Sequence, residues 1–436
     1  MSVVLGLNTL HAGASAAVVI DGKPQVAIAE ERLNRVKYYA NFPRLAVREC
    51  LRIAGLDFRD LDVVAVGRDS SANRAKKIEY VLTHPSQLLN LMQLRTSRTA
   101  LEDLKAEMAR ECEVDPAELR FKQHNVEHHL AHIASAYYIS DWDHAAGFSA
   151  DGSGDFVTCM FAECRGPEIE VKHRVYVPHS LGSLYTMVCQ FIGYTKYGDE
   201  GKVMGLAPYG EPTYADVFGD MLTCTDDGFR LNPSYFLPFG SGQGLMINER
   251  GEMEIQRHYT DRMIQLFGRP REPYTELGRR EFDLAFGVQQ VFETGFMHLL
   301  RLLHARVPSE RIAMAGGCVL NSVANGKVFD GTPFRETCIQ PAAGDEGLAL
   351  GAALYVSQAI LKGGPRCPLD HAYLGPEYDE PTIQRELDAR NVTYVRLERD
   401  ALLQETADEI VKGNVCLLYT SPSPRDRTRS RMPSSA

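Results

Sequence analysis

The strongest constraint on the fold is an order of strands and one helix that occurs twice along the chain. In its first occurrence, apolar runs are separated by a loop and by the tight turn Asp21-Gly22, which is typical of a β-hairpin. A helix and a fourth, fully apolar strand follow. The expected elements are strands over Val3–Asn8, Ala16–Ile20 and Gln25–Ala29, a helix over Pro43–Ala54 and a strand over Val63–Val66.

The second occurrence has the same β-β-β-α-β order. Its expected elements are strands over Ala145–Ala150, Phe156–Glu163 and Ile169–Val177, a helix over Leu184–Ile192 and a strand over Arg311–Ala315. Two such units that face each other place a ligand cleft between them. This organisation resembles the actin, Hsp70 and sugar-kinase class. We therefore expect an α/β, two-lobed, actin/Hsp70-like domain built from duplicated RNase H-like units.

The length of 436 residues predicts two or three domains. The expected parts are a first lobe at 1–140 with a charged helical insertion at 73–118, a second lobe at 141–362 with an irregular, acceptor-shaping insertion at 211–275, a linker at 363–370 and the start of another domain at 371–415. Residues 416–436 begin with a near-perfect translation of a common sequencing adapter and continue without an apolar period. We expect this tail to be foreign to the protein.

Composition and charge narrow the classes of partner. The net charge of −10 gives no basic surface for duplex nucleic acid, so we expect no nucleic-acid partner. No apolar stretch is long enough for a membrane span, and the N-terminus lacks the pattern of a signal peptide. The ten cysteines are scattered, without a C-x-x-C pair, and are expected to be reduced. These features predict a cytoplasmic protein.

Two histidines four residues apart carry the clearest chemical signal. His128 and His132 lie in a segment expected to be helical, so both imidazoles project from one face. Asp151, at the expected end of a strand, can complete a site of two histidines and one carboxylate, which suits a non-haem Fe²⁺ or a similar ion. The intervening His129 lies about 100° away around the helix and is expected to be dispensable for metal. A histidine pair of this spacing is also common on helix surfaces and in simple packing.

Two glycine-rich turns are candidates for anion binding. Asp151–Asp155, with the sequence DGSGD, frees backbone N–H groups to approach an anion and is also a plausible hairpin turn. Gly316–Asn321 runs from a strand into an expected helix, whose N-terminus favours phosphate. The alternative is a tight turn that only packs the helix on the strand.

Two acidic segments remain open to more than one interpretation. Gly344–Gly347 opens an expected helix of small residues at Leu348–Leu354, so Asp345 is either a metal ligand or an acid at a helix N-terminus. Glu30–Lys37 is either a solvated charge run or a segment whose Lys37 reaches a phosphate.

Five motifs and one signature then carry a resemblance to a known family. Glu200–Gly210, with the sequence EGKVMGLAPYG, resembles the signature of the O-carbamoyltransferases of nodulation-factor and antibiotic biosynthesis. The motifs match in the same order and comprise Glu30–Arg32 with Arg35 and Lys37, Glu127–His132, Asp151-Gly152, Gly316–Asn321 and Gly344–Gly347. The match extends from Val3 to about Val415. The family's N-terminal domain is similar to the enzyme subunit that threonylcarbamoylates tRNA, an actin-type fold with bound iron.

The resemblance implies roles for particular residues. It implies that Fe²⁺ or another divalent metal is held by His128, His132, Asp151 and Asp345. It implies a nucleotide site formed by Glu31, Lys37, Gly152, Ser153, Gly316, Gly317 and Asn321. His11, in the first loop, is the candidate for proton handling at the acceptor, and we count it with Asp151 as catalytic.

The implied reaction has two steps. A C-terminal YrdC-like domain converts carbamoyl phosphate and ATP into carbamoyl adenylate, and the carbamoyl group then passes to a hydroxyl of a sugar or natural-product acceptor. This chain departs from the family twice. An Asp that commonly follows the first-loop histidine is replaced in His11-Ala12-Gly13, and the YrdC-like domain expected after Val415 is missing, so we expect the activation step to be absent. An actin-fold phosphotransferase and an inactive nucleotide-binding scaffold are the alternative functions.

Overall fold

The computed structural model describes residues 2–84, 103–237 and 246–414. The expectation for the tail at 416–436 lies outside the described residues, as do parts of the segments 73–118 and 211–275. The chain divides into two compact units, Met1–Gly375 and Pro376–Ala436.

The first sheet has five strands in the order β3-β2-β1-β4-β5. Its strands are β1 (Val3–Asn8), β2 (Ser15–Ile20), β3 (Lys23–Ala29), β4 (Val63–Val66) and β5 (Lys122–Asn125). β1 pairs antiparallel with β2 and parallel with β4. Because β1, β2 and β4 are buried on both faces, they are apolar runs without alternation, whereas the edge strand β3 alternates between buried and exposed residues.

The second sheet repeats this topology in the order β8-β7-β6-β13-β14. Its strands are β6 (His144–Gly154), β7 (Val157–Arg165), β8 (Glu168–Tyr176), β13 (Arg311–Ala315) and β14 (Glu336–Ile339). β6 pairs antiparallel with β7 and parallel with β13, as β1 does with β2 and β4. The predicted duplication and the two-lobed actin/Hsp70-like class are thereby confirmed, with one further parallel strand in each sheet that the sequence did not indicate.

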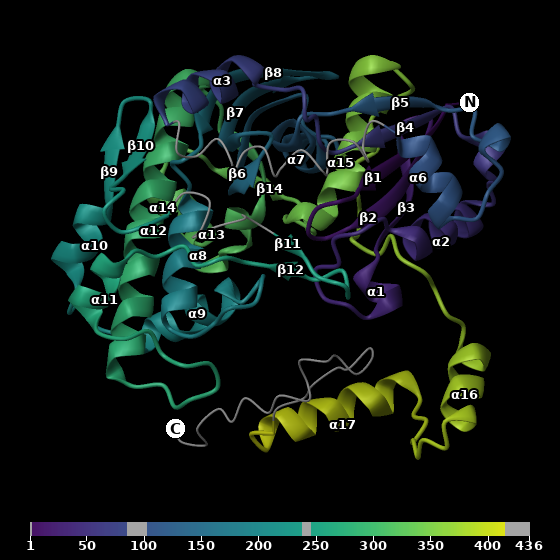
Figure 1. The fold of residues 1–436 in the computed structure, drawn as a ribbon. Coiled ribbons are helices and arrows are strands. Elements are labelled where there is room, and N and C mark those ends of the chain that lie inside the picture. The colour runs from purple at the N-terminus through teal and green to yellow at the C-terminus, as the bar shows by residue number, and fades with distance from the viewer. Residues whose placement is uncertain (1, 85–102, 238–245, 415–436) are drawn as a thin grey trace. The chain divides into compact units, whose positions relative to one another are not determined.

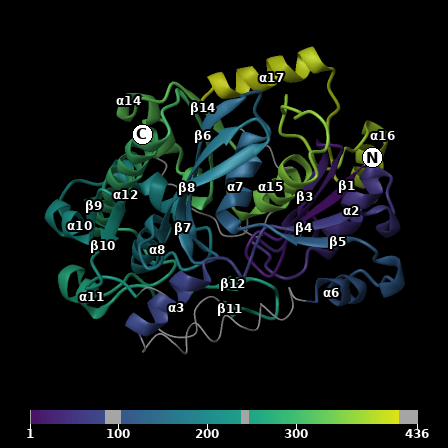
Figure 2. The same ribbon diagram turned by 90° about the horizontal axis from the view of Figure 1, so that it is seen from above.

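Two buried helices lie side by side between the sheets, α7 (His128–Tyr137) and α15 (Leu348–Tyr355) (Figures 1 and 2). α15 packs on β1, β2 and β4 of the first sheet, and α7 packs on β6, β7 and β13 of the second. Each helix therefore lies against the sheet of the lobe to which the other belongs in sequence. The lobe boundaries at 140 and 362 stay predictions.

Two further helices of the first unit cover the outer faces of the two sheets. α2 (Arg44–Ala54) packs on β2 and β3, and α8 (Leu181–Phe191) packs on β6 beneath the 28-residue α12 (Arg279–Arg306). The shorter helices are α1 (Glu31–Asn34), α3 (Arg74–Thr83), α6 (Leu104–Glu111), α9 (Glu200–Leu206), α10 (Ala215–Met221), α11 (Asp261–Phe267), α13 (Ser322–Asn325) and α14 (Val328–Gly331).

The segment at 211–275 is more regular than the sequence indicated. Besides α10 and α11 it forms two small hairpins, β9 (Leu222–Thr225) with β10 (Gly228–Leu231) and β11 (Met246–Ile247) with β12 (Met253–Glu254). Its aromatic residues Phe218, Phe229 and Phe267 are buried in the core of the second lobe. The aromatic content therefore serves packing, although its Gly and Pro residues suggested an irregular loop.

The described part of the second unit contains two helices, α16 (Glu380–Ala389) and α17 (Arg399–Val411), and neither buries a side chain. In the described residues of the whole chain, we find no helix that is both long and apolar enough to cross a membrane. The linker at 363–370 and the domain start at 371 stay predictions, and the contacts divide the chain a few residues later, at Gly375.

A substitution at the contact between α7 and α15 should destabilise the fold. A Cβ atom on Gly351 would overlap the carbonyl oxygen of Ala131, a backbone atom that cannot move alone. We expect Gly351→Val to lower the free energy of unfolding by about 1–3 kcal/mol, the usual cost of overpacking a core. Chemical denaturation measures this change.

Gly219→Ala in α10 is the matched control, because a Cβ there meets nothing within 4 Å. It should be neutral or slightly stabilising, since Ala favours the helix over Gly. Equal stability of Gly351→Val and the parent protein would contradict the close packing of α7 and α15.

Candidate metal centre

The N-terminus of α7 is fixed by a half-buried carboxylate that follows β6. Asp155 accepts hydrogen bonds from the backbone N–H of His128 at 2.9 Å and from that of Asp69 at 2.8 Å. A negative charge at this end of a helix also interacts favourably with the helix dipole. Gly154 is necessary beside it, because a Cβ at this position would overlap the imidazole of His128. The hairpin after β6 therefore sets the position of the first histidine.

Asp151 enters the centre from β6 at a point where the strand pairing is interrupted. The register with β7 breaks between Ala150 and Gly154, which frees the intervening residues from the ladder. Asp151 Oδ1 accepts the N–H of Gly152 at 2.6 Å. Its other oxygen, Oδ2, lies 3.1 Å from His132 Nε2 and 3.5 Å from His128 Nε2.

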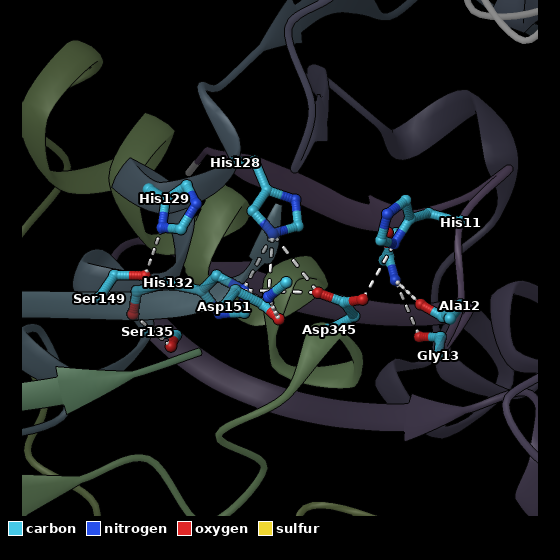
Figure 3. A network of polar contacts seen from close by, with 12 residues as sticks. His11, Ala12, Gly13, His128, His129, His132, Ser135, Ser149, Asp151 and Asp345 are labelled. Atoms are coloured by element: carbon cyan, nitrogen blue, oxygen red, sulfur yellow. Dashed lines mark hydrogen bonds and ion pairs between the residues drawn. The ribbon is translucent and has the colours of Figure 1, made fainter. Parts of the chain in front are cut away.

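Asp345 enters from the opposite side, in the turn of 3₁₀ helix at Asp345–Gly347 that leads into α15. Its Oδ1 lies 3.5 Å from His128 Nε2 and 3.4 Å from His132 Nε2. The two histidine nitrogens are 3.2 Å apart. One ligand atom from each of the four residues thus lies within 4.8 Å of every other (Figure 3).

These spacings fit a metal ion. With bonds of roughly 2.0–2.2 Å to nitrogen and oxygen, neighbouring ligand atoms of one ion are roughly 3.0–3.5 Å apart. Asp345 Oδ1 is buried and has no hydrogen-bond partner among the described residues, so an ion would supply the interaction that it lacks. Two imidazoles and two carboxylates suit Fe²⁺, Mn²⁺, Co²⁺ or Zn²⁺.

Burial and neighbouring charges shift the pKa values of these groups in opposite directions. Burial lowers the pKa of His132, but the hydrogen bond to Asp151 and the negative charge of Asp345 outweigh burial and raise the pKa to about 9. Burial and Asp151 raise the pKa of Asp345, but His11 and His132 outweigh them and lower the pKa to about 2. Burial raises the pKa of Asp151, but its contacts with His128 and His132 outweigh burial and lower the pKa well below its usual value. Both carboxylates are therefore anionic at neutral pH, and a bound cation would displace the proton of His132.

His11 lies next to the four ligands and shares one of them. Its Nδ1 is 2.9 Å from Asp345 Oδ2, the carboxylate oxygen that faces away from the histidine pair, and its ring lies edge-on to His128 (Figure 3). Burial lowers the pKa of His11, but the charge of Asp345 outweighs burial and raises it above its usual value. A carboxylate on Nδ1 fixes the ring in the tautomer whose Nε2 can accept a proton.

His129 faces away from the centre, as its place on the helix predicted. Its Nε2–H donates to the carbonyl of Val157 at 2.9 Å, and its Nδ1 accepts from Ser149 Oγ at 2.8 Å. Burial lowers the pKa of His129 well below its usual value, so the ring is neutral. This histidine fastens α7 to β6 and β7.

One of the predicted nucleotide-binding turns, Gly316–Asn321, lies next to the candidate metal centre. A Cβ on Gly317 would lie 2.8 Å from Asp151 Oδ1, so the backbone of the glycine turn lies directly against the metal carboxylate. Gly316 adopts φ 103° and a side chain there would overlap Ala150, which explains the glycine. Gly152 lies beside this turn, and the neighbouring Ser153 is exposed.

The helix expected after this turn begins only at Ser322. A 3₁₀ turn at Gly317–Leu320 comes first, and α13 has only four residues. The Asn321 side chain accepts the N–H of Ala324 and exchanges hydrogen bonds with the Gln289 amide, so its polar atoms are occupied within the protein. The nucleotide role of Asn321 stays a prediction.

Glu31 and Lys37 form a separate pair in the first lobe. Lys37 Nζ lies 3.3 Å from Glu31 Oε1, and Glu31 Oε2 accepts the backbone N–H of Tyr38 at 2.8 Å. The segment is therefore a defined turn, and the Lys37 side chain keeps 29% of its surface exposed. Its contact with a nucleotide stays a prediction.

Tyr197 is at the centre and was missed in the sequence. Its hydroxyl donates to Asp345 Oδ2 at 3.3 Å. Burial raises the pKa of Tyr197 well above its usual range, so it is a hydrogen-bond donor at any physiological pH. The only signal in the sequence was its place just before the Glu200–Gly210 signature.

Removing both histidines should remove the metal. We expect the double variant His128→Ala/His132→Ala to retain no ion after incubation with Fe²⁺ and desalting, because half of the ligand atoms are lost. Elemental analysis of the desalted protein measures the stoichiometry. His129→Ala is the control and should keep the metal while losing stability, since it removes two buried hydrogen bonds of about 1 kcal/mol each. Unchanged metal in the double variant would contradict the centre.

Comparisons with known proteins identify the family. Residues 3–354 match the family model described as carbamoyltransferase N-terminus. The chain is 32% identical over 434 residues to an uncharacterized protein of Synechocystis sp., covering 95% of this chain and 68% of that protein. It is 31% identical over 413 residues to the nodulation protein NolNO of Sinorhizobium fredii, covering 94% of this chain and 55% of NolNO.

Solved structures are more distant. HypF from T. kodakarensis matches with a TM-score of 0.37 at 14% identity, covering 84% of this chain and 48% of HypF. A ROK hexokinase from Thermus thermophilus matches with a TM-score of 0.37 at 11% identity, covering 83% of this chain and all of the hexokinase. These likenesses are too weak to carry an argument.

The family model, in contrast, spans all four residues of the candidate metal centre, His11 and the two glycine turns. The chain belongs to the carbamoyltransferase family.

Proposed function

We propose that this centre transfers a carbamoyl group from carbamoyl adenylate to a hydroxyl of a sugar or natural-product acceptor. The observation that carries the proposal is the Asp345 carboxylate, which faces the histidine pair with one oxygen and His11 with the other. This arrangement supports a general base at His11 beside a site for a Lewis acid. The family supports carbamoyl transfer in general, and the adenylate donor and the hydroxyl acceptor are the proposed refinements.

In the proposed step, His11 Nε2 takes the proton of the acceptor hydroxyl while the hydroxyl oxygen attacks the carbamoyl carbon. The C–O bond to the adenylate phosphate breaks, AMP leaves as an anion, and the product is an O-carbamate. Asp345 holds the His11 ring and stabilises the imidazolium that forms. A bound Fe²⁺ or other divalent ion would supply polarisation of the carbamoyl carbonyl.

The donor's nucleotide would lie along the glycine turns. The backbone of Gly317 lies against Asp151, so a phosphate near the N–H groups of Gly316 and Gly317 is close to the carboxylates of the centre. Lys37, in the first lobe, would neutralise the phosphate charge. Carbamoyl phosphate and ATP are the proposed source of the adenylate.

The alternative phosphotransferase fits this centre less well. Mg²⁺, the ion of kinases, prefers oxygen ligands and keeps several waters. Here two imidazole nitrogens converge within 3.2 Å of each other in a buried position. The centre therefore suits a transition metal better than Mg²⁺.

Direct transfer tests the proposal. Metal-loaded protein is incubated with carbamoyl adenylate and a panel of hydroxylated acceptors, and the carbamate product and AMP are measured by mass spectrometry. We expect acceptor-dependent AMP release, and we expect His11→Gln to lower it by about 10²–10⁴-fold, the usual contribution of general base catalysis, with unchanged metal content. Acceptor-independent hydrolysis alone, or full transfer by His11→Gln, would contradict the proposal.

Replacing Lys37 tests its proposed contact with the nucleotide phosphate. Lys37→Ala should weaken ATP binding by roughly tenfold or more, because one charge-assisted hydrogen bond is worth about 1.5–3 kcal/mol. Calorimetry measures the affinity, and metal content should not change. Lys76→Ala, which removes an exposed lysine paired with Glu79 in α3, is the matched control and should bind ATP like the parent. Equal affinity of Lys37→Ala and the parent would make Glu30–Lys37 a solvated charge run.

A further inference from the structure

The signature segment Glu200–Gly210 has no assigned role, and the residues before it reach the metal centre. α9 begins at Glu200, and the turn Lys196–Asp199 precedes it. The Tyr197 side chain extends from this turn to Asp345, which is 148 residues later in the chain. Lys202 of the signature contacts Asp199 of this turn through its side chain at 2.8 Å and through its backbone N–H at 2.9 Å. The signature is therefore bonded to the turn whose tyrosine touches a proposed metal ligand.

The two carboxylate oxygens of Asp345 have different neighbours. Oδ2 accepts the Tyr197 hydroxyl at 3.3 Å and lies 2.9 Å from His11 Nδ1. Oδ1 faces the histidine pair and has no hydrogen-bond partner among the described residues. The hydrogen bond from Tyr197 and the close contact with His11 on one oxygen hold the carboxylate plane and leave the other oxygen directed at the ion site.

Tyr197 is itself held in place from two directions. The backbone N–H of Asp199 donates to the carbonyl of Lys196 at 3.2 Å and closes the turn. Gly198 adopts φ 81°, and a side chain there would overlap the ring of Tyr38. The Tyr38 and Tyr197 rings meet edge to face with centroids 5.3 Å apart. The turn is therefore packed against the Glu31–Tyr38 segment of the first lobe.

We propose that Tyr197 is a positioning residue of the metal centre. Its hydroxyl orients Asp345 so that Oδ1 points at the ion, and its ring connects this carboxylate to the segment that carries Glu31 and Lys37. The inference rests on the metal centre of the proposed function. It adds a role for the start of the Glu200–Gly210 signature, whose Lys202 is bonded to the turn that carries the tyrosine.

Co²⁺ binding tests the proposal without any turnover. The protein is titrated with Co²⁺, and the visible absorption bands report both affinity and ligand geometry. We expect Tyr197→Phe to bind Co²⁺ about 10–100-fold more weakly, the usual effect of losing a group that orients a metal ligand, with shifted bands. Phe keeps the ring contact with Tyr38, so the variant removes the hydroxyl alone.

Tyr235→Phe is the matched control. Its hydroxyl also donates to a carboxylate, Asp220 Oδ2 at 2.7 Å, but neither residue belongs to the metal centre. It should bind Co²⁺ like the parent, and thermal denaturation without metal should show that both variants are folded.

The outcomes separate the two proposals. If Tyr197→Phe and the parent have equal affinity and identical bands, the role of Tyr197 is refuted while the centre stands. If the parent binds no Co²⁺, or if His128→Ala/His132→Ala binds it equally well, the metal centre itself is refuted and the role of Tyr197 with it.

Discussion

The contact between α7 and α15 is the constraint on which the rest of the structure depends. Each helix packs on a different sheet, and the small residues of α15 let the two backbones approach closely at Gly351 and Ala131. α7 carries both histidines, and Asp345 lies in the turn just before α15. The packing that joins the two lobes therefore also sets the distance between the histidine pair and Asp345.

Electrostatics favour a cation in this arrangement. Asp151 and Asp345 are carboxylates in a buried place, where an uncompensated charge costs several kcal/mol. Each has one oxygen satisfied by the protein, through the Gly152 N–H for Asp151 and through His11 and Tyr197 for Asp345. The remaining oxygens face the same two imidazoles. A bound ion that satisfies both would stabilise the folded state in proportion to its affinity.

The sequence predicted the parts of the fold that depend on local pattern. Four of the five strands of each sheet were predicted within a few residues, because buried strands are continuous apolar runs and their hairpins contain Asp-Gly or Gly-Pro turns, whereas β5 and β14 were not predicted. The spacing of His128 and His132 predicted their common face, because residues four apart on a helix lie on one side of it. Tertiary contacts between residues distant in the sequence had no such signal. The 3₁₀ turn that precedes α13 was not predicted, because a glycine turn that leads into a 3₁₀ turn has the same composition as one that leads directly into a helix.

Tyr197 shows why the remainder of the centre could not be predicted. A tyrosine in a polar loop has no periodicity, and its partner Asp345 is distant in the chain. Only the folded structure shows that the loop before α9 packs against the first lobe through Tyr38. The same reason applies to Asp155, which resembled the end of a hairpin turn and instead holds the N-terminus of α7.

The first loop shows how the centre is arranged without the acid that the family commonly has after the histidine. Ala12 and Gly13 occupy this region, and the Asn8 side chain donates to both of their carbonyls, at 2.8 and 3.0 Å, which shapes the loop. Gly13 adopts φ 70° and approaches the backbone of Glu346, so the loop lies directly on the turn that carries Asp345. That contact brings His11 within 2.9 Å of Asp345 Oδ2. The carboxylate that orients the histidine is therefore supplied by the second lobe, and the loop itself needs no acid for this purpose.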